Sequence, residues 1–97
     1  MLSKRFFKKG SECEVTFRYR PEGATEVVVL TEANGWSPVP MQQLKSGEFK
    51  ARVKLPVDQR IQFRYLIDGS RWENDDAADA YVPNEYGGEN SIVDTSA

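Results

Sequence analysis

The stretch IQFRYLIDG, residues 61–69, decides the fold class of this chain. Every second residue from Ile61 to Ile67 is large and apolar, and Gln62 and Arg64 lie between them. Side chains of a β-strand point alternately to opposite faces, so this pattern predicts a strand with one buried face and one outward face. The Asp68-Gly69 pair that follows is typical of a tight turn. The segment is therefore expected to be a strand that ends in a hairpin turn.

Four further segments have the composition of strands. Residues 13–19 and 49–55 show the same alternation over their whole length, and the run VVVL at 27–30 predicts a strand with both faces covered. Residues 90–94 can supply a closing strand. Turn-forming residues separate these runs at 21–23, 34–35, 46–47, 56–58, 68–69 and 87–88. The sequence thus predicts an all-β antiparallel sandwich of about seven strands, with one short helical turn at most, over residues 75–81.

The core of this sandwich is expected to come from the inward positions of the three alternating strands. These positions are Cys13, Val15, Phe17, Tyr19, Phe49, Ala51, Val53, Leu55, Ile61, Phe63, Tyr65 and Ile67. The only cysteine, Cys13, excludes an internal disulfide and is expected to be a buried, inert thiol. Without repeats or a low-complexity linker, residues 1–97 are interpreted as a single domain held by packing alone.

Composition excludes several partners. With a net charge of −2 and 29% charged residues, the chain carries no field that favours nucleic acid or an anionic membrane. The basic residues Lys4, Arg5, Lys8 and Lys9 beside Phe6-Phe7 are interpreted as a solvated edge strand. No apolar run approaches the roughly 20 residues that span a bilayer, and no segment resembles a signal peptide. A cytoplasmic protein is the expectation.

The residues for most catalytic chemistry are missing. The chain has no histidine, which removes the common nucleophilic triads and the commonest metal ligand. The acidic stretch 73–79 fails the calcium-loop template, because Asp79 stands where that loop needs glycine. A glycosidase carboxylate pair would lack room for a substrate cleft, so the stretch is interpreted as a solvated loop. The expectation is a protein that is no enzyme and holds no metal or cofactor.

Two tryptophans remain as binding candidates. Trp36 follows the Asn34-Gly35 turn, and Trp72 lies beyond Asp68-Gly69 on the hairpin that carries Arg64. A tryptophan in a small sandwich is usually core, but placement beside turns weakens that reading. Indole faces suit the flat C–H face of a sugar ring, and arginine or asparagine suits its hydroxyls. A shallow platform for a sugar is therefore one interpretation of these residues.

Several motifs, in order along the chain, strengthen this interpretation. They are Asn34-Gly35-Trp36-Ser37-Pro38, Phe63-Arg64-Tyr65-Leu66-Ile67-Asp68-Gly69, Trp72-Glu73-Asn74-Asp75, Val82-Pro83-Asn84 and Gly87-Gly88-Glu89-Asn90-Ser91. Together they resemble carbohydrate-binding module family 48, the glycogen-binding domain of the β subunit of AMP-activated kinase. Similar domains precede the catalytic barrels of isoamylases and branching enzymes. The resemblance covers about residues 15–93 and implies an immunoglobulin-like, early-set β-sandwich.

The resemblance also implies roles for five residues. Trp36 and Trp72 match the tryptophans that stack on glucose, and Arg64 stands where the kinase domains have a sugar-contacting lysine. Tyr86 stands where they have a leucine that inserts into the glucan coil, and Asn90 matches a polar contact at the end of that loop. Residues 31–33 depart from the usual segment before Trp36, and Arg71 lengthens the turn before Trp72.

Two functions follow as hypotheses. The first is a non-catalytic module for α-glucan (glycogen, starch or maltooligosaccharide), which is expected to act as a stand-alone adaptor or sensor. The alternative is a protein-interaction domain whose exposed aromatics dock onto a partner of glucan metabolism, such as an enzyme or kinase, without binding sugar.

Overall fold

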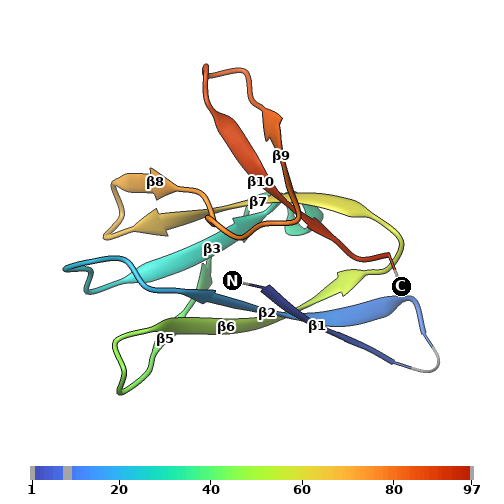
Figure 1. The fold of residues 1–97 in the computed structure, drawn as a ribbon, viewed down its shortest axis with the longest axis horizontal. Coiled ribbons are helices and arrows are strands. Elements are labelled where there is room, and N and C mark those ends of the chain that lie inside the picture. The colour runs from blue at the N-terminus through green and yellow to red at the C-terminus, as the bar shows by residue number, and fades with distance from the viewer. Residues whose placement is uncertain (1, 8–9, 97) are drawn as a thin grey trace.

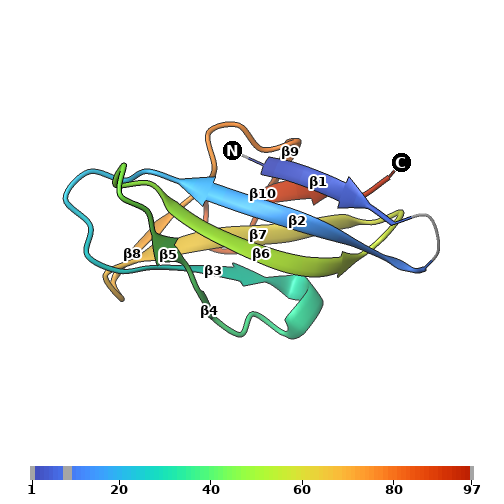
Figure 2. The ribbon, with the colours of Figure 1, turned by 90° about the horizontal axis from the view of Figure 1, so that it is seen from below.

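Two antiparallel sheets packed face to face make up the computed structural model, which describes residues 2–7 and 10–96 (Figures 1 and 2). The strands are β1 (Leu2–Phe6), β2 (Glu12–Tyr19), β3 (Val27–Thr31), β4 (Val39–Pro40), β5 (Gln42–Gln43), β6 (Phe49–Pro56), β7 (Arg60–Ile67), β8 (Arg71–Glu73), β9 (Ala80–Pro83) and β10 (Glu89–Asp94). One sheet has the order β1-β2-β6-β5. The other has the order β4-β3-β7-β10-β9, with β8 also paired to β7. The predicted all-β sandwich is confirmed.

The predicted core is confirmed as well. Ten of the twelve inward positions are buried, and the other two, Tyr19 and Val53, are partly buried against the same cluster. Phe17 and Phe63 meet edge to face across the two sheets, with ring centroids 5.0 Å apart. Cys13 is fully buried, as expected, and burial raises the pKa of its thiol. The alternation of apolar and polar residues along the sequence therefore predicted the buried positions correctly.

The described residues form more strands than the sequence predicted. The additional ones are mostly short: β4 and β5 have two residues each, and β8 has three. Strands of two or three residues are too short to show an alternating sequence pattern. Whether they form depends on the neighbouring strand with which they pair. The predicted turn at Asn34-Gly35 belongs to a 3₁₀ helix, η1 (Glu32–Asn34), which Gly35 ends in the left-handed conformation at φ 71°. Residues 75–81, expected to form at most one helical turn, contain none.

The interpretation of residues 73–79 as a solvated loop is wrong for Asp75, which is fully buried. The Tyr65 hydroxyl donates to its Oδ2 over 2.8 Å, and the Ala77 amide donates to its Oδ1 over 2.8 Å. Its own amide donates to Ser91 Oγ over 3.0 Å. Tyr65 and Ser91 come from β7 and β10, so a buried role for Asp75 follows from the tertiary fold and not from its acidic neighbours in the sequence.

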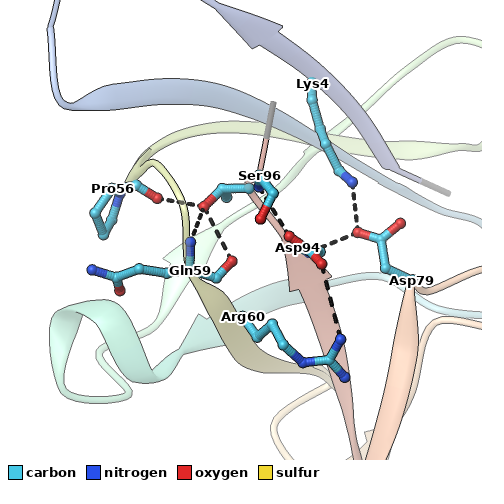
Figure 3. Close-up of polar contacts among 8 residues, drawn as sticks. Lys4, Pro56, Gln59, Arg60, Asp79, Asp94 and Ser96 are labelled. Atoms are coloured by element: carbon cyan, nitrogen blue, oxygen red, sulfur yellow. Dashed lines mark hydrogen bonds and ion pairs between the residues drawn. The ribbon is translucent and has the colours of Figure 1, made fainter.

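A polar cluster ties the two sheets together near the end of β10 (Figure 3). Lys4 on β1 forms an ion pair of 2.7 Å with Asp79, which also accepts the backbone amide of Asp94 on β10 over 2.7 Å. Beyond it, Thr95 Oγ1 donates to the Pro56 carbonyl over 2.6 Å. The predicted N-terminal edge strand is confirmed as β1, whereas Lys8 and Lys9 lie outside the described residues. These contacts supplement apolar packing in a chain without a disulfide.

Two tyrosines make the fold sensitive to alkali. Tyr19 and Tyr65 stack with centroids 4.4 Å apart, and their hydroxyls donate to Glu73 and Asp75. Burial, first, and these carboxyl groups raise the pKa of both phenols well above the ordinary 10.0. Above that pH the unfolded chain releases protons that the folded chain retains, which favours unfolding. Urea unfolding should therefore show a free energy that falls progressively from pH 10 upward.

The variant Tyr19→Phe removes one of the two phenols and should make this decline shallower. A free energy of unfolding that stays constant between pH 9 and pH 11 would contradict the prediction.

Within the described ranges, no helix combines the length and apolar character that crossing a membrane requires.

Candidate functional site

The site is built where β7 changes partners. One edge of β7 pairs with β3, and its other edge is shared between β10, opposite residues 60–63, and β8, opposite residues 65–67. Arg64 lies at the changeover. From this point the β9–β10 hairpin rises away from the rest of the molecule, while β8 stays beside the far end of β7 (Figure 1). The two arms enclose a corner on the outer face of the sheet.

An open pocket of about 880 Å³ occupies this corner. Its lining residues are Trp36, Gln62, Arg64, Trp72, Pro83, Asn84, Glu85, Tyr86 and Asn90. All five predicted site residues are among them, although they come from separate segments of the chain. The structure therefore brings the predicted residues together around one pocket.

Trp36 is held in place by the turn that follows β3. Its amide donates to the Thr31 carbonyl over 2.8 Å, and the Asn34 carboxamide both donates to and accepts from the backbone of Ser37. Glu32 Oε2 accepts a hydrogen bond from the backbone amide of Gln62 over 2.7 Å and so ties η1 to β7. Trp36 itself adopts φ 64°, a left-handed conformation that costs about 1–2 kcal/mol for a residue with a side chain. This strain is tolerated at a position whose side chain lines the pocket.

Trp72 lies on strand β8, opposite Leu66, and not in a loop, where the sequence suggested it. The Arg64 guanidinium lies over its ring, 5.6 Å from the centroid, and 46% of Trp72 is exposed. The neighbouring residue on β8, Glu73, pairs with Arg71 over 2.7 Å and accepts from the Tyr19 hydroxyl of the opposite sheet. β8 is thus held by its pairing with β7 and by the contact with Tyr19, and Trp72 forms a fixed wall of the pocket.

The opposite wall is the loop between β9 and β10. Asn84 Oδ1 accepts the backbone amides of Tyr86 and Gly88 over 2.9 and 3.1 Å, which closes the loop around its side chain. Tyr86 is 85% exposed at the tip, the highest value of any large apolar or aromatic side chain in the described chain. Asn90 bridges this loop to β7, because it accepts from Asn84 and donates to Gln62.

Four lining residues were not predicted as site residues: Gln62, Pro83, Asn84 and Glu85. Gln62 shares the outward register of β7 with Arg64, which is a signal that could have found it. Pro83 and Asn84 lie within one of the motifs quoted above, but nothing in their own chemistry marked them as lining. The lining holds one cation, Arg64, and one anion, Glu85. Such a surface suits an uncharged ligand with flat faces and many hydroxyls.

In the part of the chain that the structure describes, no three His, Cys, Asp or Glu side chains group closely enough to hold a metal ion. Asp75 contacts β7 and β10, so it is engaged in the fold itself.

A scan against protein-family models and a search of the curated proteins both find no match for this chain. Membership of carbohydrate-binding module family 48 therefore stays a prediction from the sequence motifs.

Proposed function

We propose that this chain is a non-catalytic binding module for α-glucans such as glycogen, starch or maltooligosaccharides. The observation that carries the proposal is the gathering of Trp36, Arg64, Trp72, Tyr86 and Asn90 around one open pocket. The sequence alone had marked each of these residues as a binding candidate. An immunoglobulin-like, early-set version of the sandwich and a cytoplasmic location belong to the same proposal.

The chemistry of the lining supports a sugar ligand. Three exposed aromatic rings offer apolar faces to the C–H groups of pyranose rings. Guanidinium and carboxamide groups between them can donate to and accept from the hydroxyls at the ring edges. The chain has no histidine and so lacks the common nucleophilic triads, which favours a binding module in this proposal.

Weak affinity is expected. Aromatic stacking contributes about 1–3 kcal/mol per ring by analogy with stacked nucleobases, so two rings with hydrogen bonds give about 4–6 kcal/mol. That free energy corresponds to a dissociation constant between about 1 mM and tens of micromolar. A branched polymer that offers many chain ends would then be retained chiefly through repeated engagement.

A titration with maltoheptaose or β-cyclodextrin, followed by tryptophan fluorescence, tests the proposal. Both tryptophans line the pocket, so an occupied site should change their emission with saturation in that concentration range. Cellohexaose serves as the control, because its extended β-linked chain presents a different curvature to the same rings. Unchanged emission with about 10 mM maltoheptaose, well above the expected constant, would refute glucan binding.

The competing proposal is a docking surface for a protein partner of glucan metabolism. The observation in its favour is Tyr86, which stands almost fully exposed at the tip of a projecting hairpin, where an interface anchor would lie. The two functions separate in one comparison. Docking without sugar binding predicts that Trp72→Ala abolishes capture of the partner while maltoheptaose has no effect on either protein.

A further inference from the structure

The side-chain amides beside the pocket form a chain with a defined direction. Its first member is Asn84, whose Oδ1 accepts the backbone amides of Tyr86 and Gly88. Backbone amides can only donate, so the oxygen of Asn84 is committed to them and its Nδ2 must point the other way. That Nδ2 donates to Asn90 Oδ1 over 3.2 Å.

The donor-to-acceptor direction of the hydrogen bonds that Asn84 sets continues through Asn90 to Gln62 on β7. Because Asn90 Oδ1 accepts from Asn84, its Nδ2 is the group that faces Gln62, and it donates to Gln62 Oε1 over 2.8 Å. The oxygen of Gln62 is thereby occupied, and its Nε2, with two N–H groups, is the free end of the chain. No acceptor among the described residues takes these protons, and Gln62 lines the pocket.

A second donor lies beside this free end. Arg64 is two residues along the outward face of β7 and lines the same pocket. Its guanidinium lies over Trp72, and its buried Nε has no hydrogen-bond partner within the described residues. Because this Nε is shielded from solvent, the rest of the guanidinium is the part of Arg64 that a ligand can reach. This part of the pocket therefore offers donors in excess of acceptors.

We infer that Gln62 contacts the ligand as a hydrogen-bond donor beside Arg64, and that Asn84 is a positioning residue that fixes its orientation through Asn90. The inference rests on the proposed glucan function and adds to it a specificity-determining pair. Gln62 and Arg64 together recognise acceptor oxygens at neighbouring positions of the sugar, while the aromatic rings hold its faces. Asn84 touches no ligand in this role, since its carboxamide is engaged by the loop and by Asn90.

The contact is tested with Gln62→Met, which keeps the length and volume of the side chain but removes both donors, together with the oxygen that accepts from Asn90. Loss of hydrogen bonds worth about 1–2 kcal/mol weakens binding about 5- to 30-fold. The affinity for maltoheptaose is measured by calorimetry in wild type and variant. Wild-type binding together with unchanged affinity in Gln62→Met overturns the inference alone, whereas no wild-type binding overturns the proposed function itself.

The positioning role is tested with Asn84→Asp. The introduced carboxylate still accepts the two loop amides, so the loop stays closed, but it has no donor for Asn90. Asn90 then turns its Nδ2 toward that carboxylate and its oxygen toward Gln62, which must turn in response and present its own oxygen to the pocket. That oxygen lies beside Arg64 and can accept from it, so both groups are withdrawn from the ligand. We expect affinity to fall about 3- to 10-fold, and the uncharged ligand leaves no direct role for the added charge.

A double-mutant cycle distinguishes this relay, the effect of Asn84 on Gln62 through Asn90, from a general disturbance of the loop. In the Gln62→Met background, Asn84→Asp should weaken binding less than about 2-fold, because the group through which it acts is absent. Additive losses of affinity would overturn the relay.

If a variant does not fold, NMR of the side-chain amides of the wild-type protein tests the contact between Gln62 and the ligand instead. The Gln62 resonances should shift with maltoheptaose while those of Gln42 and Gln43, on β5 of the other sheet, stay fixed, and unshifted Gln62 resonances refute the contact.

Discussion

Replacing Trp72 with alanine should lower the affinity for maltoheptaose about 5- to 150-fold, which corresponds to the loss of about 1–3 kcal/mol from one aromatic stack. The indole is a wall of the pocket and is 46% exposed, so the ring is available to a ligand. The substitution also removes the surface on which Arg64 rests, 5.6 Å from the ring centroid. A freed guanidinium must be ordered again when sugar binds, which adds to the loss.

The fold should tolerate this change, because the backbone ladder with β7 keeps β8 paired and Tyr19 holds it from the opposite sheet. Calorimetry or co-sedimentation with glycogen measures the effect without depending on indole emission. Phe7→Ala is the matched control, since Phe7 is 41% exposed and does not line the pocket. Equal affinities for the two variants would remove Trp72 from the site.

Asp75→Ala should lower the free energy of unfolding by about 2–4 kcal/mol. The substitution leaves the buried Tyr65 hydroxyl without its acceptor, which costs about 1–3 kcal/mol, and it also removes the hydrogen bond from the amide of the exposed Ala77. Asp76→Ala provides the control within the same acidic segment, because Asp76 is exposed. A change within about 0.5 kcal/mol is expected there.

Urea denaturation of both variants at pH 7 measures the difference. Similar losses at Asp75 and Asp76 would mean that net charge in this loop matters more than the buried hydrogen bonds. Asp75 also lies between β8 and β9 along the chain, so its loss should loosen the approach of Trp72 to the β9–β10 hairpin. We expect weaker glucan binding in Asp75→Ala even under conditions where the variant is fully folded.

The sequence was sufficient to predict the two sheets and the residues buried between them, because the alternation of apolar and polar residues is a local property of each strand. The strand from Ile61 to Ile67 carries its buried and outward faces in its own residue pattern, and each predicted core position is buried or partly buried in one cluster. The outward position of Arg64 follows from the same rule. Trp36 and Trp72 were singled out by their residue type and their place beside turns. The motif resemblance added roles for Tyr86 and Asn90, and the structure places all four together with Arg64 around one pocket.

What the sequence could not supply depends on partners distant along the chain. Asp75 is buried because Tyr65 and Ser91 contact it, and nothing among its acidic neighbours signals this. Asn84 acts on Gln62 through Asn90, although the two residues belong to different hairpins of the sheet. The Asp68-Gly69 pair predicted the turn after β7 but not the three-residue strand β8, which pairs with the part of the β7 edge that β10 leaves free beyond residue 63.

The shared edge of β7 has a consequence for how such a protein can change over evolution. One arm of the pocket, β8, is fixed to the opposite sheet through Tyr19, whereas the tip of the other arm is a turn closed around the side chain of Asn84. Residues can be inserted into or deleted from that turn at a small entropic cost, while the interior keeps its composition. The length of that turn can thus change without altering the interior of the sandwich, whereas the pocket residues on β7 and β8 are tied to the fold itself.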